Sequence, residues 1–333
     1  MLTLGIESSC DDTAAAVLQD DSTLLSSVLT SQDQIHTRFG GVVPELASRC
    51  HLESIVPVVN ESLKRAKITI SDIDLIAVTQ GPGLIGSLLV GFSYAKALSY
   101  ISKIPFVGVD HMAGHILSVF LEEDKPEFPF IALVVSGGTS SIYRADTFTK
   151  FTLLGRTRDD AAGEAFDKVA KLLGFPYPGG PVISHEAQSG DNEAIQFPRS
   201  WLEKGSLDFS FSGLKTSVLN HCNREKQKNN PLQLADICAS FQEAAVEVLV
   251  EKTLLAASQQ SIQNIVLGGG VSSNPRLRQL MERRCSEDGK KLHIPRPSYC
   301  TDNGAMIAIA GVHSHRENSE FSYDLDVYSR SAL

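Results

Sequence analysis

Long hydrophobic runs are missing from the sequence, although 42% of its 333 residues are hydrophobic. Crossing a bilayer takes about 18 or more consecutive apolar residues, so we predict no transmembrane helix and no membrane partner. The first residues, Met1 to Glu7, contain no basic side chain and soon reach an acid. This pattern predicts a first strand and not a signal peptide.

Paired cysteines are also missing. The sequence has six cysteines and no Cys-x-x-Cys motif; they are Cys10, Cys50, Cys222, Cys238, Cys285 and Cys300. Scattered cysteines without a secretion signal are typical of reduced thiols. We therefore expect a cytoplasmic protein.

An excess of positive charge is missing as well. The chain has 30 Lys and Arg against 39 Asp and Glu, a formal net charge of -9. Bulk attraction to a polyanion is thereby excluded, so a nucleic-acid ligand needs a local basic patch or a helper protein. Two basic clusters are present, each either a solvated face or such a patch: Arg276, Arg278, Arg283, Arg284, Lys290 and Lys291, and Arg224, Lys226 and Lys228.

Two histidines four residues apart, His111 and His115, open an apolar run that predicts a helix to about Leu121. At this spacing both imidazoles lie on one helix face, about one turn apart. The strand at 104–109 brings them to a strand's carboxyl end, where open α/β sheets bind ligands. Two imidazoles form half of a metal site. The alternative is a pair of surface histidines, with Asp110 capping the helix.

The first part of the chain predicts alternating strands and helices. Strands are expected at 3–7, 13–18, 23–29, 74–79 and 104–109, and helices at 44–66 and 84–102. The turn at 8–12 either offers backbone N–H groups to a phosphate or is an ordinary hairpin. One apolar face of the first helix is formed by Leu52, Ile55, Val56, Val59 and Leu63.

The same pattern then begins again. Strand, small-residue turn and strand follow over 130–145, as they do over 3–18. The Gly268-Gly269-Gly270 turn leads from a strand into a helix, as at 78–84. This repetition predicts two related α/β lobes. We place the first lobe at 1–122 plus about 303–333, and the second at 123–302 with a helical insertion at about 161–260.

Two such lobes, each with a small-residue hairpin, resemble the actin/Hsp70/sugar-kinase (ASKHA) fold. This resemblance implies nucleotide phosphates at the turns 8–13 and 136–140, and adenosine against the turn 268–270.

A closer resemblance covers residues 2 to about 312. The motifs that carry it are Gly41-Val42-Val43-Pro44-Glu45-Leu46-Ala47-Ser48-Arg49, Gly81-Pro82-Gly83-Leu84, His111-Met112-Ala113-Gly114-His115, Val135-Ser136-Gly137-Gly138, Gly163-Glu164-Ala165-Phe166-Asp167-Lys168, Pro178-Gly179-Gly180-Pro181, Phe209-Ser210-Phe211-Ser212-Gly213-Leu214-Lys215-Thr216 and Gly268-Gly269-Gly270-Val271-Ser272-Ser273-Asn274. In these motifs the sequence resembles the tRNA adenosine threonylcarbamoyltransferases of the TsaD (or Gcp) type, a family once described as O-sialoglycoprotein endopeptidases.

The resemblance implies a metal site. His111, His115 and Asp302 match the family's ligands, usually to Fe²⁺, one per subunit. Two histidines and a carboxylate suit Fe²⁺ or Zn²⁺ and leave positions for substrate oxygens.

The resemblance also implies contacts with an adenylate. The matching positions are Val134, Val135, Ser136, Gly137, Gly138, Asp167, Gly180 and Asn274. Two of these residues have a structural role as the alternative to ligand contact. Asp167 is then a solvated helix residue, and Asn274 is the N-cap of a helix that begins at Pro275.

The implied reaction transfers threonylcarbamoyl from threonylcarbamoyl-AMP to the exocyclic amine of the adenosine 3′ to the anticodon, in tRNAs that read codons beginning with adenine (t6A biosynthesis). Its implied partners are tRNA, a paralogous actin-fold protein and a small ATPase. We expect the helices at 44–66 and 84–102 to dock the paralogue, and a bulky residue at Gly91 to prevent this. No residue stands out as a general base, so the catalytic residue stays unassigned.

Three rival functions fit the sequence less well. A zincin-type protease needs glutamate at 112, where the chain has methionine. An actin-fold small-molecule kinase uses Mg²⁺ with oxygen ligands, which paired histidines do not suit. A nucleotide-gated scaffold would hold no transition metal. The sequence also departs from the family pattern at Thr139, where histidine is common, and at Asp12 and Cys50.

Overall fold

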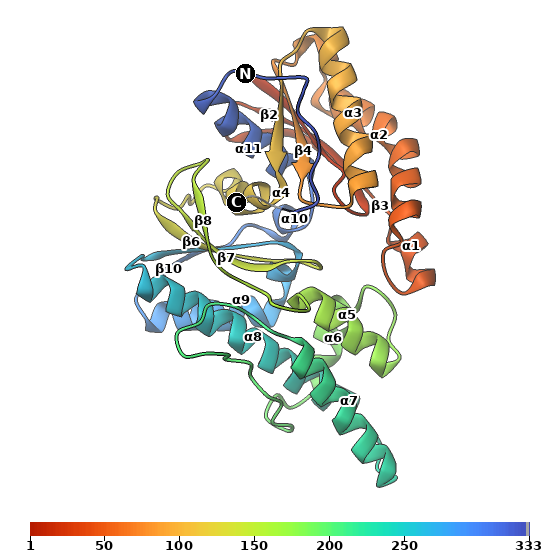
Figure 1. Ribbon diagram of the computed structural model, residues 1–333, viewed down its shortest axis with the longest axis vertical. Coiled ribbons are helices and arrows are strands. Elements are labelled where there is room, and N and C mark those ends of the chain that lie inside the picture. The colour runs from red at the N-terminus through yellow and green to blue at the C-terminus, as the bar shows by residue number, and fades with distance from the viewer. Residues whose placement is uncertain (331–332) are drawn as a thin grey trace. The chain divides into compact units, whose positions relative to one another are not determined.

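The computed structural model describes residues 1–330 and 333 and divides the chain into two compact units. Unit 1 comprises Met1–Pro126, Asp146–Phe151 and Pro295–Leu333, and unit 2 comprises Glu127–Ala145 and Thr152–Ile294. Each unit contains one five-stranded sheet (Figure 1). The predicted α/β class is confirmed. The unit boundaries differ from the predicted lobe boundaries, because 123–126, 146–151 and 295–302 belong to unit 1.

The sheet of unit 1 has the strand order β3-β2-β1-β4-β5. Its strands are β1 (Leu2–Glu7), β2 (Asp12–Gln19), β3 (Thr23–Ser31), β4 (Leu75–Gly81) and β5 (Phe106–Asp110). β1 pairs antiparallel with β2, so that Leu4 lies opposite Val17, and parallel with β4, so that Leu4 lies opposite Ile76. β5 continues the sheet in parallel with β4. All five strands fall where the sequence predicts them.

The helices of unit 1 cover both faces of this sheet. They are α1 (Asp33–His36), α2 (Pro44–Ala66), α3 (Ile85–Ser102), α4 (His111–Leu117), α10 (Pro297–Cys300) and α11 (Gly304–Glu317), with short 3-10 turns at Thr37–Phe39, Ile70–Asp72 and Ser118–Leu121. The helix predicted to reach Leu121 is therefore α4 followed by a 3-10 turn. The two long predicted helices are confirmed as α2 and α3.

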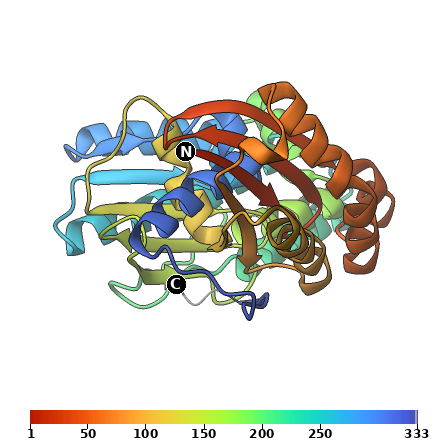
Figure 2. The ribbon, with the colours of Figure 1, turned by 90° about the horizontal axis from the view of Figure 1, so that it is seen from above.

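Strand alternation decides which helix meets which face. Leu4 and Ile6 point into an apolar cluster that also contains residues of α2 and α3. Gly5, between them, faces α11: a Cβ built there would lie 2.1 Å from the carbonyl oxygen of Gly304. Figure 2 shows the strands between α11 on one side and α2 and α3 on the other. Glycine at position 5 thus lets α11, and the residues just before it, lie close to the sheet.

The predicted apolar face of α2 needs correction. Ile55, Val59 and Leu63 are buried, but Leu52 is 65% exposed and Val56 is 46% exposed. Gly91 of α3 also lies inside, since a Cβ there would be 2.3 Å from Oγ of Ser8. A bulky residue at Gly91 would disturb the packing of α3 on the strands, so it does not test the helix surface.

Unit 2 repeats the strand arrangement of unit 1. Its strands are β6 (Phe130–Val135), β7 (Ser140–Ala145), β8 (Phe151–Arg156), β9 (Asn264–Gly268) and β10 (Lys291–His293), in the order β10-β9-β6-β7-β8. β6 pairs antiparallel with β7 and parallel with β9, as β1 does with β2 and β4. The predicted repetition is confirmed at the level of topology.

The helices of unit 2 lie mainly in the predicted insertion. They are α5 (Ala162–Leu173), α6 (Gly179–Glu186), α7 (Ser212–Gln227), α8 (Leu234–Gln259) and α9 (Pro275–Glu287), with 3-10 turns at Ala187–Ser189 and Gly270–Ser273. Ile131, Leu133 and Val135 of β6 pack into one core with these helices. In that core Phe166 of α5 meets Phe241 of α8 edge to face at 4.9 Å.

Among the described residues, no helix combines the length and the apolar composition needed to span a bilayer.

Candidate metal site and adenylate-binding turns

The two-histidine motif lies where a strand runs directly into a helix. β5 ends at Asp110, and α4 begins at His111. The Asp110 carboxylate caps the helix, because its Oδ1 accepts hydrogen bonds from the backbone N–H groups of Met112 at 2.8 Å and Ala113 at 3.3 Å. This cap satisfies donors that the first turn of a helix leaves without partners. The suggested capping role of Asp110 is confirmed, but the alternative of surface histidines is wrong, because His111 and His115 are both buried.

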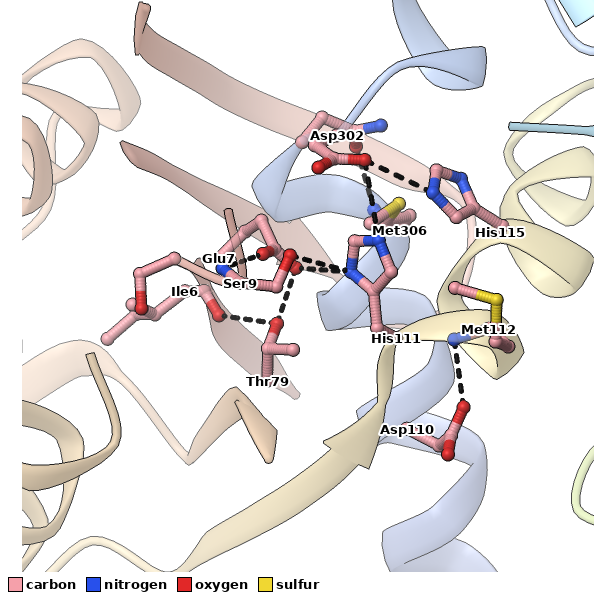
Figure 3. Close-up of polar contacts among 12 residues, drawn as sticks. Ile6, Glu7, Ser9, Thr79, Asp110, His111, Met112, His115, Asp302 and Met306 are labelled. Atoms are coloured by element: carbon pink, nitrogen blue, oxygen red, sulfur yellow. Dashed lines mark hydrogen bonds and ion pairs between the residues drawn. The ribbon is translucent and has the colours of Figure 1, made fainter. Parts of the chain in front are cut away.

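Asp302 joins the two histidines, although it is distant in sequence. Its Oδ1 lies 3.4 Å from Nε2 of His111 and 3.1 Å from Nε2 of His115. The three donor atoms lie within 4.8 Å of one another. Figure 3 shows the carboxylate facing both rings. Asp302 comes just before Asn303, whose side chain caps α11 by accepting from Met306 N–H. The structure therefore brings together all three predicted ligands within unit 1.

A second carboxylate fixes the ring of His111. Glu7, at the end of β1, is fully buried, and its Oε2 lies 3.0 Å from Nδ1 of His111 (Figure 3). The hydroxyl of Thr79 on β4 donates to the same oxygen at 2.5 Å, and the backbone N–H of Ser9 donates to Oε1. With Nδ1 held by Glu7, Nε2 is the nitrogen that faces Asp302. A carboxylate behind a metal-binding histidine is a common arrangement, which sets the tautomer and the ring orientation.

The electrostatics of this cluster follow from its two carboxylates. Burial opposes the charged form of His111, but Glu7 and Asp302 raise the pKa of its imidazole well above the ordinary value. Burial likewise opposes ionisation of Asp302, but His111 and His115 lower the pKa of its carboxyl. The pKa of Glu7 is lowered despite burial, mainly because His111 lies beside it. The imidazole of His111 thus lies between two carboxylates and favours the ionised form of both.

The donor set fits a transition metal. His115 is fully buried, and neither of its ring nitrogens makes a hydrogen bond of good geometry. Buried polar atoms normally form hydrogen bonds, so a buried imidazole that faces Asp302 at 3.1 Å without hydrogen-bond geometry, beside a second imidazole, points to a ligand. Two nitrogens and one oxygen are donors that Fe²⁺ and Zn²⁺ accept.

In unit 2, the turn after β6 is open on one side. A Cβ built on Gly137 or Gly138 would meet no atom within 4 Å. On its other side the turn is tightly packed: a Cβ on Gly269 would lie 2.4 Å from the Val135 carbonyl oxygen, and one on Gly163 would lie 2.5 Å from that of Ser136. Val134 and Val135 themselves are buried strand residues. The structure thus places the 136–138 turn beside the 268–270 turn and the start of α5.

The other predicted adenylate contacts lie at or near the starts of α6 and α9; they are Asp167, Gly180 and Asn274. Oδ1 of Asp167 accepts the backbone N–H of Gly179 at 2.7 Å, which ties α5 to the start of α6. A Cβ on Gly180 would meet nothing within 4 Å. Asn274 caps α9 by accepting from the backbone N–H groups of Arg276 and Leu277, and it donates to Gln242 at 2.8 Å. The N-cap alternative for Asn274 is confirmed. Asp167 has a structural bond, so it is more than a solvated helix residue.

The basic cluster on α9 is partly neutralised. Arg276 pairs with Glu243 of α8, and Arg284 pairs with Glu251. On α7, Glu225 lies 3.7 Å from both Arg224 and Lys228. Neither cluster is a uniformly positive surface.

Sequence reasoning missed Glu7, Thr79 and Ser9. The available signal was Glu7 itself, an acid at the end of an apolar strand that the topology places in the middle of a sheet. A carboxylate is rarely buried without a partner, so an acid at such a position predicts a histidine or another cationic side chain beside it.

Comparison with solved structures defines the class of fold. Full-length HypF, in a phosphate- and nucleotide-bound form, superposes with a TM-score of 0.66 at 15% identity, over 96% of this chain and 56% of that one. Component A of (R)-2-hydroxyglutaryl-CoA dehydratase from Acidaminococcus fermentans superposes with a TM-score of 0.54 at 13% identity, over 95% and 99%. The fold is of the actin-like ASKHA class.

Sequence comparison defines the family. The family model described as tRNA N6-adenosine threonylcarbamoyltransferase (TsaD) matches residues 23–309. The tRNA N6-adenosine threonylcarbamoyltransferase of Desulfotalea psychrophila is 60% identical, over 100% of this chain and 98% of that protein. The protein with the same name from Syntrophus aciditrophicus is 54% identical over the same shares. The chain belongs to the tRNA N6-adenosine threonylcarbamoyltransferase family.

Proposed function

We propose that this chain is an acyltransferase that modifies tRNA. It moves threonylcarbamoyl from threonylcarbamoyl-AMP to the N6 amine of the adenosine 3′ to the anticodon, in tRNAs that read codons beginning with adenine. The observation that carries the proposal is the family match over residues 23–309 in a chain that also clusters His111, His115 and Asp302.

The proposed cofactor is Fe²⁺, with Zn²⁺ as the alternative, one per subunit. His111, His115 and Asp302 would hold it, and when bound it supplies a Lewis acid for an oxygen of the threonylcarbamoyl group.

Residues of the chain itself prepare this site. Glu7 holds the ring of His111 so that Nε2 stays turned toward Asp302. Asp110 fixes the start of α4 and hence the direction of His111, the next residue. These contacts set the donor positions before any ligand binds, which lowers the ordering that binding requires.

For the adenylate, the proposed contacts are in unit 2. The open backbone of Gly137 and Gly138 can approach the phosphate. The space beside Gly180 lets the nucleotide pass close to the start of α6. Asp167 and Asn274 have polar atoms for ribose and base in addition to their structural bonds.

In the proposed reaction, the adenosine N6 forms a bond to the carbamoyl carbon, and the bond from that carbon to the phosphate oxygen breaks. AMP leaves with the bonding electrons, and the amine loses one proton. Positioning of the two reactants is a large part of such catalysis. No side chain is assigned as the base.

The proposed partners are tRNA, a paralogous actin-fold protein and a small ATPase, and the proposed location is the cytoplasm. The surface proposed for the paralogue is the exposed apolar face of α2 and α3, formed by Leu52, Val56, Ile85 and Leu89.

A transfer assay tests the function. Purified protein, unmodified tRNA and threonylcarbamoyl-AMP are mixed with and without the partner proteins, and the digested tRNA is analysed for threonylcarbamoyl-adenosine by mass spectrometry. We expect product from the wild type and none from a His111→Ala/His115→Ala variant. His315→Ala, which removes a histidine of α11, is the control and keeps activity. Absence of product from folded, metal-loaded wild type with all partners would contradict the proposal and favour a kinase or scaffold.

A further inference from the structure

The segment after α11 returns to the sheet of unit 1. We call residues 319–328 the C-terminal strap. Side chains of α3 and β4 hold the backbone of the strap. Nζ of Lys96 donates to the Leu325 carbonyl, and Nε2 of Gln80 donates to the Asp326 carbonyl at 2.7 Å. The Tyr323 ring stacks on Phe106 of β5, with centroids 5.5 Å apart. The strap thus runs along the strands that lead to the two-histidine helix.

Tyr328 sits in a place that glycine leaves free. A Cβ built on Gly81, at the end of β4, would lie 2.2 Å from the Tyr328 carbonyl oxygen and 2.5 Å from its ring. The backbone N–H of Tyr328 donates to the Gln80 carbonyl at 3.1 Å. Both the ring and the backbone of Tyr328 are therefore held at the carboxyl end of β4, next to the end of β5.

From this position the Tyr328 hydroxyl donates to Oδ2 of Asp110 at 2.8 Å. The other oxygen of the same carboxylate, Oδ1, caps the first turn of α4 (Figure 3). Since Asp110 directly precedes His111, the orientation of this carboxylate and the direction of the first imidazole are coupled through one peptide unit.

We propose that Tyr328 is a positioning residue for the two-histidine helix: its hydroxyl holds Asp110 in the capping orientation and thereby sets the place of His111. The inference rests on the proposed metal site, which it deepens by assigning a role to the C-terminal strap. The Tyr328 hydroxyl donates to Asp110 and not to a ligand donor, so Tyr328 acts on the site through Asp110.

The chain offers a matched control. The hydroxyl of Tyr323, also in the strap, lies 3.0 Å from Oγ of Ser99 on α3 and does not involve Asp110. Tyr328→Phe and Tyr323→Phe each remove one strap hydroxyl and keep the ring. A strap that merely stabilises unit 1 would make the two variants behave alike.

The first measurement is amide hydrogen exchange of metal-free protein, read on a peptide that covers 106–117. We expect Tyr328→Phe to speed the exchange of the first turn of α4 and Tyr323→Phe to leave it unchanged. The second is a Co²⁺ titration followed by absorbance. Loss of one hydrogen bond to the capping carboxylate of Asp110 predicts a dissociation constant about fivefold higher for Tyr328→Phe only.

The outcomes separate this inference from the proposed metal site. Faster exchange and weaker Co²⁺ binding confined to Tyr328→Phe support the positioning role. Unchanged exchange in Tyr328→Phe, or equal changes in both variants, overturns it. A wild type that binds no Co²⁺ contradicts the metal site, and the exchange data then still decide whether Tyr328 holds the start of α4.

Discussion

Oε2 of Glu7 lies 3.0 Å from Nδ1 of His111, at the meeting point of β1 and α4. Replacing Glu7 with glutamine keeps the size of the side chain but allows its amide to turn either an oxygen or an N–H toward the ring. We expect Glu7→Gln to weaken Co²⁺ or Fe²⁺ binding by about 10- to 100-fold, the usual effect of losing a carboxylate behind a metal-binding histidine. The measurement is a metal titration of the purified variants.

Glu243→Gln is the control for this variant. Glu243 is another largely buried carboxylate, in unit 2, where it pairs with Arg276. If both substitutions lower metal affinity equally, the effect reflects general destabilisation and not the orientation of His111.

Substitutions of two glycines at the 136–138 turn, Gly138 and Gly163, distinguish an effect on ligand binding from an effect on packing. Gly138→Ala adds a methyl group where no protein atom lies within 4 Å, so the free energy of unfolding should change by less than about 0.5 kcal/mol. If the adenylate phosphate occupies that space, the same methyl group should weaken binding of a non-hydrolysable threonylcarbamoyl-AMP analogue by about tenfold, since overpacking costs about 1–3 kcal/mol. Calorimetric titration measures the affinity, and denaturant unfolding measures the stability.

Gly163→Ala should behave in the opposite way. Its Cβ would lie 2.5 Å from the Ser136 carbonyl oxygen, so we expect a loss of stability of about 1–3 kcal/mol. Unchanged analogue binding in a stable Gly138→Ala variant would argue against an adenylate at this turn.

Most of the fold could be predicted from the sequence because its signals are local. Buried apolar strands, the glycine turns that follow them and Pro44 at the start of α2 mark the elements directly. The internal repeat then gives the topology, since β1, β2 and β4 have the same pairing as β6, β7 and β9. The boundaries between units depend on tertiary contacts, so residues 146–151 could not be assigned to unit 1 in advance.

The site was predictable in part for the same reason. His111 and His115 are four residues apart, so local spacing reveals them, whereas Asp302 was found only through the resemblance to a known family. Glu7 and Tyr328 act on the site through contacts between distant elements, which no local pattern shows. The orientation of α2 and α3 was also hidden, because Leu52 and Ile55 are equally apolar and only packing decides which one is buried.

The exposed face of α2 and α3 gives a prediction about the partner protein. The two helices touch where a Cβ on Gly86 would lie 2.3 Å from Oγ of Ser48, and Leu52 and Leu89 follow within about one turn of that contact. Leu52 is 65% exposed and Leu89 is 43% exposed. Leu52→Glu and Leu89→Glu should each leave the fold intact, because neither side chain is in the core.

If this face binds the paralogous protein, each substitution should weaken the complex by about 2 kcal/mol or more, because a charge would be buried in an apolar contact. Gel filtration of the mixed proteins measures complex formation. Leu219→Glu, at a 40% exposed position on α7, is the matched control and should elute with the partner. An undiminished complex with both α2 and α3 variants would exclude this face.

His313 on α11 gives a prediction about pH and stability. The side chain is 8% exposed, and its ring stacks on Phe148 with centroids 3.5 Å apart. Burial, helped by the positive charges of Arg316 and Lys125 and opposed by Asp21 and Glu317, lowers the pKa of His313 to about 4. The folded state therefore keeps this imidazole neutral at pH values where the unfolded chain, with an ordinary pKa of about 6.5, binds a proton.

Stability from this group is fully present above about pH 6.5 and is lost as the pH falls toward 4, because the unfolded state binds more protons in that range. The loss between pH 7 and pH 4.5 should be roughly 2–3 kcal/mol. His313→Phe keeps an aromatic ring against Phe148 and removes the titrating group. Between pH 7 and pH 4.5 the variant should therefore lose roughly 2–3 kcal/mol less stability than the wild type. Urea unfolding of both proteins at the two pH values measures the difference. Parallel losses in wild type and variant would show that His313 does not contribute to the acid sensitivity of unit 1.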